Sequence, residues 1–277
     1  MSVPRLRPRR WAAALLGVAL LVLPARSTWS IVVVDTGTRE VCVATATCVN
    51  GLNIRNIVPV IVPERGVAAV QAAGDPGGWV RTRIWRGFHA GLTTERILGV
   101  CAAFYGHKGR QYGIVNFDDP PQTYSGILNL AAAGGVTGVV GDLRYAIQGN
   151  ILVGEEVWLE AEKALLGTPG DLSQKVMAAM EIARALGGDG RCSCSQSYPT
   201  RCGVPPPGFT KSAHCAYIGI ARVGDSEGSC AKGIGCANGD YYLSLNVVGG
   251  LSAPDPVFVL QGMYASWRQA QQGRPDQ

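Results

Sequence analysis

The chain has 277 residues, of which 47% are hydrophobic and 16% charged, and its formal net charge is +5. Residues 1–27 hold five arginines and no acidic residue, so the remainder carries 20 Lys and Arg against 20 Asp and Glu. This balance leaves no basic surface for nucleic acid and no acidic tail for a charged partner. About 250 residues suffice for one sizeable hydrophobic core, so we expect a single domain that does not bind nucleic acid.

The N-terminus is typical of an export signal. Four arginines within residues 5–10 precede an apolar run over residues 11–23, and Ala25 and Ser27 place small residues before a cleavage point. We expect a signal peptide over residues 1–27 and a secreted or periplasmic protein whose first residue is Thr28. Cleavage after Ala25 is the alternative. The run is too short to cross a hydrocarbon core of about 30 Å as a helix, which favours a cleaved signal over an uncleaved anchor, the alternative. We expect no membrane attachment after cleavage.

Beyond the signal, the patterning predicts strands and helices in separate groups. Apolar and β-branched runs predict strands, and 3.6-residue periodicity predicts helices. In chain order, we expect strands over 30–35, 40–47, 57–62 and 66–72, helices over 79–89 and 93–105, strands over 111–117 and 123–128, a glycine-rich connection over 134–141, a strand over 145–152, helices over 155–166 and 172–186, strands over 217–223 and 241–248, and a helix over 256–268. Paired helices between groups of strands favour an α+β layered domain over an alternating parallel sheet.

Nine cysteines in an exported chain favour disulfides. Six of them crowd into one window and are predicted to pair mainly with one another, which would fasten a loop-rich insertion at about residues 190–240. These six are Cys192, Cys194, Cys202, Cys215, Cys230 and Cys236. A zinc site at Cys192-x-Cys194 lacks the usual paired spacing and a nearby histidine doublet, so we expect no metal. The odd total leaves at least one thiol unpaired in a monomer.

Two conventional motifs, those of zinc proteases and of dinucleotide-binding sites, are missing from the sequence. His-Glu-x-x-His and Gly-x-Gly-x-x-Gly do not occur, Gly-x-Ser-x-Gly occurs only over residues 224–228, and His89 and His107 are expected at a helix end and in a loop. Thr28 is therefore a candidate nucleophile that needs no histidine, because an N-terminal threonine carries its own base. The α-amine, with a pKa of about 7.7–8.0, lies beside the hydroxyl. The alternative is a secreted protein that merely begins with threonine.

Four segments carry a family resemblance. Residues 28–32 (Thr-Trp-Ser-Ile-Val), 145–152 (Tyr-Ala-Ile-Gln-Gly-Asn-Ile-Leu), 187–189 (Gly-Gly-Asp) and 255–256 (Asp-Pro) resemble the family called domain of unknown function 1028. That family is similar to N-terminal nucleophile (Ntn) hydrolases. The resemblance implies a four-layer αββα sandwich, with two β-sheets between pairs of helices, over residues 28–270. It leaves residues 271–277 as a disordered tail and places Thr28 at the family's first-residue position.

Candidate catalytic roles follow for three residues. Thr28 is the predicted nucleophile, and Asn150 is predicted to donate its amide N–H to the oxyanion of a tetrahedral intermediate. Asp189 would orient the amine or its water. Asn150 beside Gly149 and Asp189 after Gly188 are also ordinary turn residues, and that alternative stays open.

Thr45, Thr47 and Gln148 are the predicted substrate-binding residues. No cofactor is expected, and the predicted partner is an amide-type small molecule or a peptide, with homo-oligomerisation left open. The function predicted from these residues is a secreted amidohydrolase with an acyl-threonine intermediate. The alternative is a non-catalytic binding or structural module on the same fold.

Overall fold

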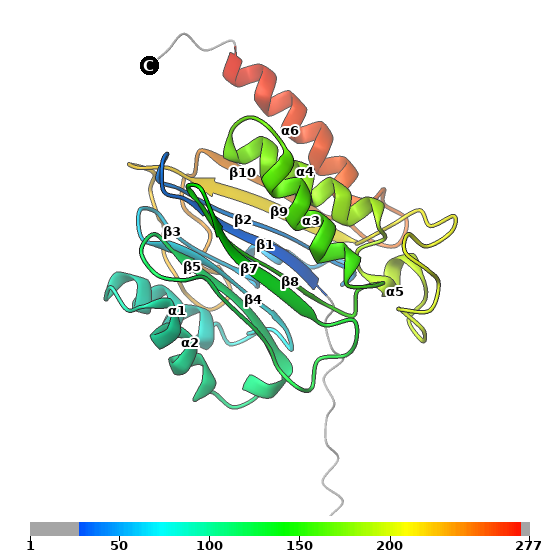
Figure 1. Ribbon diagram of the computed structural model, residues 1–277, viewed down its shortest axis with the longest axis horizontal. Coiled ribbons are helices and arrows are strands. Elements are labelled where there is room, and N and C mark those ends of the chain that lie inside the picture. The colour runs from blue at the N-terminus through cyan, green and yellow to red at the C-terminus, as the bar shows by residue number, and fades with distance from the viewer. Residues whose placement is uncertain (1–27, 273–277) are drawn as a thin grey trace, which may run out of the picture.

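The computed structural model describes residues 28–272, so the predicted signal peptide and residues 273–277 lie outside the described part. The described chain is mixed α/β, with two antiparallel sheets and six α-helices (Figure 1).

The strands are β1(Thr28–Asp35), β2(Glu40–Thr47), β3(Pro59–Val62), β4(Gly66–Ala72), β5(Arg110–Asn116), β6(Gln122–Ser125), β7(Gly134–Val140), β8(Leu143–Asn150), β9(Cys215–Ala221) and β10(Leu243–Val248). The helices are α1(Trp79–His89), α2(Thr94–Ala102), α3(Glu156–Gly167), α4(Leu172–Ala185), α5(Gly190–Ser193) and α6(Pro256–Gln272). Gln271 and Gln272 thus belong to α6 and not to a tail.

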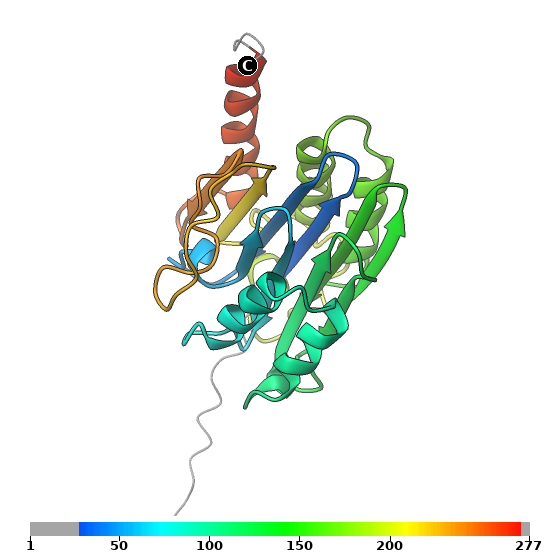
Figure 2. The ribbon, with the colours of Figure 1, turned by 90° about the vertical axis from the view of Figure 1, so that its left-hand side faces the viewer.

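The larger sheet has the order β10-β9-β2-β1-β8-β7 and the smaller one β3-β4-β5-β6. Side chains of successive strand residues point to opposite faces, and β1 shows the result. Trp29, Ile31 and Val33 pack with residues of α3, α4 and α6, whereas Val32 and Val34 pack with residues of the smaller sheet such as Val67 and Val115. Figure 2 shows the two sheets lying against each other.

The second face of the smaller sheet is covered by α1 and α2. Val60, Val70 and Ile114 of its strands share a buried cluster with Ile84 of α1 and Ile97 of α2. Apolar burial, at roughly 25 cal/mol per Å², is the main favourable term at each of these contacts. The spacing that predicts the two helices therefore also identifies the side chains that fix them to the sheet.

Residues 134–141, predicted as a loose connection, form the edge strand β7 instead. Atoms of β8 lie so close to two glycines of this strand that a side chain would not fit there. A Cβ at Gly135 would lie 2.4 Å from the Ile147 carbonyl oxygen, and a Cβ at Gly138 would lie 2.1 Å from the Tyr145 hydroxyl. The glycine-rich composition therefore reflects close approach to β8 and not a loop.

Candidate functional site

The candidate site lies at one end of the larger sheet, where β1 begins and β2 and β8 end. Thr28 stands opposite Asn150 in the antiparallel register. The Thr28 backbone nitrogen donates to Asn150 Oδ1 at 3.1 Å, and the Thr28 hydroxyl donates to Thr47 Oγ1 at 3.3 Å. Thr28 is 3% exposed. Thr28, the predicted nucleophile, thus contacts both the predicted oxyanion donor Asn150 and the predicted binding residue Thr47.

Behind Thr28, two glutamines of the smaller sheet bridge the two sheets. Gln71 Nε2 donates to the Thr28 carbonyl oxygen at 2.8 Å and to Gln111 Oε1 at 2.6 Å. Gln111 Nε2 in turn donates to the Gly149 carbonyl oxygen at 2.7 Å. Both glutamines are at most 1% exposed. A buried network of this kind rigidifies its members, so the backbone of Thr28 is held from both sheets.

Two non-glycine residues beside this network have left-handed backbone. Ile151 follows Asn150 with φ 53°, and Ala72 follows Gln71 with φ 68°. For a β-branched residue such as isoleucine this conformation is strained, and such strain concentrates at functional sites. The Ile151 N–H donates to the Leu130 carbonyl at 3.1 Å, and the Ile151 carbonyl accepts from Gly190 N at 3.0 Å. These bonds hold the turn that ends β8 at Asn150.

Asp189 is fully buried at the start of α5, and its carboxylate binds groups other than the Thr28 amine. Its Oδ2 accepts from the Cys48 backbone N–H at 2.8 Å and from Arg191 Nη2 at 3.0 Å, while its Oδ1 accepts from the Arg191 backbone N–H at 3.1 Å. Asp189 therefore caps α5 and fastens it to the end of β2. The group that holds the Thr28 nitrogen is Asn150.

The remaining two predicted binding residues lie deeper between the sheets. Thr45 is fully buried, and its hydroxyl donates to the Trp29 carbonyl oxygen and accepts from Ser30 Oγ. Gln148 is also fully buried and faces Gly113 of β5, where a Cβ would lie 2.4 Å from Gln148 Oε1. Neither amide atom of Gln148 has a hydrogen-bond partner within the described residues. Among the three predicted binding residues, Thr47 is the one whose side chain hydrogen-bonds to Thr28.

The cysteine pairing differs from the expected one in two positions. Within the window, the pairs are Cys194–Cys202 and Cys230–Cys236. Cys192 instead pairs with Cys48 at the end of β2, because the Asp189 hydrogen bond brings α5 to that strand. Cys215 is an unpaired, buried residue of β9, where its thiol donates to the Val49 carbonyl. The window is therefore not all loop, since β9 crosses it as a core strand.

Similarity to known proteins places the chain in a family. The family described as "Family of unknown function (DUF1028)" matches residues 28–198. The chain belongs to this family. A solved structure of protein SPO2555 from Silicibacter pomeroyi, also of DUF1028, is similar at a TM-score of 0.61 over 87% of this chain and 88% of that one, with 16% identity. That likeness shows the fold alone. No curated protein matches the chain.

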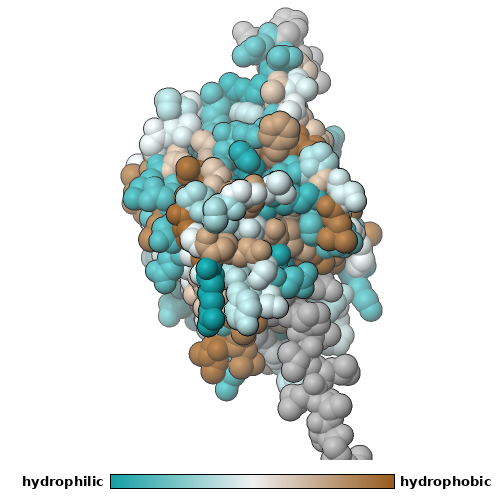
Figure 3. Space-filling model, turned by 90° about the vertical axis from the view of Figure 1, so that its right-hand side faces the viewer, coloured by the Kyte–Doolittle hydropathy of each residue, from teal (hydrophilic) through white to brown (hydrophobic). Residues whose placement is uncertain are grey.

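This DUF1028 chain has a cavity of about 490 Å³ next to the site. The cavity is lined by Ile151 and Arg191 and by the segment that the Cys194–Cys202 disulfide closes. Figure 3 shows the side of the molecule that carries this segment, where apolar residues occur in small groups among polar ones. Arg191 and Arg201 contribute guanidinium groups to the lining, and that of Arg191 is paired with Asp189. A small molecule or peptide end would have room here.

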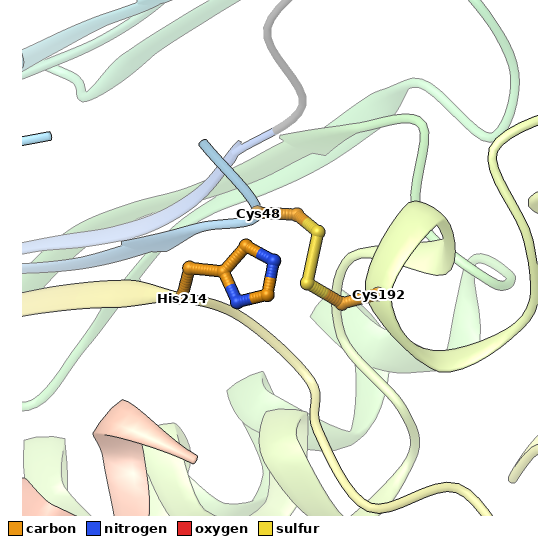
Figure 4. A group of neighbouring side chains, drawn as sticks. All are labelled: Cys48, Cys192 and His214. Atoms are coloured by element: carbon orange, nitrogen blue, oxygen red, sulfur yellow. A yellow bond between two sulfur atoms is a disulfide. The ribbon is translucent and has the colours of Figure 1, made fainter. Parts of the chain in front are cut away.

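Several residues of the site are not predicted from the sequence. Ser30, Gln71 and Gln111 are polar residues inside otherwise apolar strands, and that interruption is the signal that would have singled them out. His214 is the other omission. It is 7% exposed, directly precedes β9, and points toward the Cys48–Cys192 disulfide in Figure 4. Burial and the nearby Lys211 lower the pKa of His214, outweighing the opposite effect of Asp189.

Proposed function

We propose that this DUF1028 protein is an exported Ntn-type amidohydrolase and that Thr28, once it is the first residue, is the nucleophile. The observation that carries the proposal is the pair of contacts at Thr28. Its nitrogen, the future α-amine, is held by Asn150 Oδ1 while its hydroxyl faces Thr47 Oγ1. Nucleophile and base thus share one residue whose orientation both sheets restrain.

The reaction we propose follows from these contacts. The free amine of Thr28 accepts the hydroxyl proton, directly or through a water, and Oγ1 attacks the carbonyl carbon of an amide. Asn150 Oδ1 accepts an N–H of the neutral amine, which leaves the nitrogen lone pair available for the proton. Collapse of the tetrahedral intermediate expels the leaving amine with that proton and leaves an acyl-threonine ester, which water then hydrolyses. The amide N–H group of Asn150 is our candidate for the oxyanion donor, a contribution worth about 2.7–4 kcal/mol in comparable sites.

Fold class and location belong to the same proposal. Helices against the outer face of each sheet support the four-layer αββα sandwich of Ntn hydrolases. Three disulfides support an oxidising, extracytoplasmic location, and no described helix is long and apolar enough to span a membrane. Removal of residues 1–27 during export would then expose Thr28.

The cavity beside Ile151 and Arg191 is the proposed place for the substrate, an amide-type small molecule or a peptide. Thr47 would contact it at the nucleophile, while Thr45 and Gln148 would shape the site from within. The non-catalytic binding module remains the second candidate, and the 3% exposure of Thr28 is the observation that favours it.

A covalent probe tests the proposal without a known substrate. The exported protein is incubated with a β-lactone, which acylates N-terminal threonine nucleophiles, and the adduct is located by peptide mass analysis. We expect one adduct, at Thr28. Thr36→Ala is the matched control, because Thr36 follows the opposite end of β1 and bears an exposed hydroxyl bonded to Asp142. Labelling that is absent, or that persists in Thr28→Ala, would favour the binding module.

A further inference from the structure

A second constellation lies one residue beyond Thr47. Cys48 and Cys192, joined as a disulfide, and His214 each offer a metal-ligand atom, and these atoms lie within 4.8 Å of one another (Figure 4). Within residues 28–272 no other three His, Cys, Asp or Glu side chains offer ligand atoms this close together. The three residues come from separate elements, namely the end of β2, α5 and the segment before β9.

The imidazole of His214 is available to act as a metal ligand. The side chain is more than nine-tenths buried, and its Nδ1 has no hydrogen-bond partner within the described residues. An imidazole nitrogen without another partner is available as a metal ligand. The His214 backbone N–H donates to the Thr47 carbonyl at 2.8 Å, which fixes the position of the residue beside Cys48.

We propose that reduction of the Cys48–Cys192 disulfide converts this cluster into a Cys₂His site for a single thiophilic divalent cation of the Zn²⁺ class. Zn–S bonds of about 2.3 Å and Zn–N bonds of about 2.0–2.1 Å place tetrahedral ligand atoms about 3.5–3.8 Å apart, within the spread observed here. Cys48 and Cys192 are each half-buried, so the ion has an approach and a fourth position remains for water.

The chemistry balances with a dithiol as reductant. The dithiol supplies two electrons and two protons, becomes a disulfide, and leaves Cys48 and Cys192 as thiols. Binding of the cation then releases both thiol protons to solvent. The cation would replace the disulfide as the link between β2 and α5. This site is independent of the proposed Thr28 chemistry.

Metal titration of the folded protein tests the proposal. In the background Cys194→Ser, Cys202→Ser, Cys230→Ser and Cys236→Ser, the protein is reduced with a dithiol, desalted anaerobically and titrated with Co²⁺ and then with Zn²⁺. We expect one equivalent of Co²⁺, a thiolate-to-cobalt charge-transfer absorption, and displacement by Zn²⁺. The oxidised form of the same protein should bind neither ion, and this comparison needs no further mutation.

Two variants locate the ligands. Added to that background, Cys48→Ser with Cys192→Ser should abolish the charge-transfer absorption, and His214→Asn should weaken binding about tenfold or more. Circular dichroism checks that each variant is folded. The proposal is overturned if the reduced protein takes up no stoichiometric cation, if the oxidised form binds equally well, or if folded His214→Asn binds with unchanged affinity.

Discussion

The space between the two sheets has two ends of opposite character, although the same strands form both. At one end the inward-facing residues of β1 and β2 are Val32, Val34, Val41 and Val43, packed with valines of the smaller sheet. At the other end the same faces carry Thr28, Ser30, Thr45 and Thr47, met by Gln71 and Gln111. Burying a polar group is costly unless it is hydrogen-bonded, so packing alone does not explain the polar end. The difference between the ends is the structural argument for function at Thr28.

The largest expected effect concerns Thr28 itself. Thr28→Ala should abolish β-lactone labelling and any amide hydrolysis, because the only proposed nucleophile is removed. The melting temperature should change little, because one small hydroxyl is lost. Thr28→Ser should retain part of the reactivity, since hydroxyl and amine stay adjacent. One residue added before Thr28 should be nearly as damaging as the alanine change, because the amine becomes an amide. Reactivity that survives both changes excludes the Ntn mechanism.

Next in size is the disulfide that links the end of β2 to α5. In the chain-entropy view, Cys48–Cys192, with a sequence separation of 144, stabilises by about 5 kcal/mol, whereas Cys230–Cys236, with a separation of 6, stabilises by about 2 kcal/mol. Urea unfolding of Cys48→Ser with Cys192→Ser should therefore show the greater loss of unfolding free energy. Equal losses in the two double variants would contradict this ranking.

Variants of Asn150 at the polar end and of Val32 at the apolar end allow a direct comparison of the two ends. Asn150→Ala removes the acceptor of the Thr28 nitrogen and should slow β-lactone labelling about 100-fold or more. Val32→Ala, at the apolar end, should cost about 1–3 kcal/mol of unfolding free energy and leave the labelling rate unchanged. Labelling kinetics and urea unfolding of both variants measure the contrast. Slow labelling of Val32→Ala together with a normal labelling rate of Asn150→Ala would contradict the placement of the reactive site at the polar end.

The smallest expected effect lies outside both ends, at Asp171. This residue caps α4 and binds Arg268 of α6. Burial raises its pKa, but hydrogen bonds from Ser173, the Gln174 backbone and Arg268 outweigh burial and lower it overall. Because the folded pKa lies below the unfolded one, the stabilisation is present above about pH 4 and is lost as pH falls through the folded value.

Asp171→Ala should therefore cost about 1 kcal/mol at pH 7 and progressively less in acid. Urea unfolding between pH 2 and 7, with Asp171→Asn as the variant that keeps the cap, measures this dependence. A cost that does not fall in acid would show that the charge of Asp171 is irrelevant. Labelling at Thr28 should be unaffected throughout.

Much of the fold could be predicted from local patterns. The ranges expected for β2, β4 and α1 agree with the observed bounds, because apolar periodicity and turn residues are local signals. The edge strand β7 was missed, because the reason for its glycines is their contact with Tyr145 and Ile147 across the sheet. The cysteine partners likewise depend on where Asp189 places α5, which no local pattern reveals.

Some residues of the candidate site could likewise be predicted from the sequence, and others could not. The sequence predicts Thr28 and Asn150 together, because both lie in segments that carry the family resemblance, and the two residues are in contact in the structure. Gln71, Gln111 and His214 belong to strands and segments that come close to Thr28 or Cys48 only through the tertiary fold. Their chemistry could be recognised only once those neighbours were known.

The identity of the mature N-terminus decides whether Thr28 can act as both nucleophile and base. Intact-mass measurement of the exported protein, combined with sequencing of its N-terminal peptide, gives the first residue. We expect cleavage between Ser27 and Thr28, so that Thr28 carries a free α-amine. A mature protein that retains Arg26 and Ser27 would contradict the account, because Thr28 would then have no amine to act as its base.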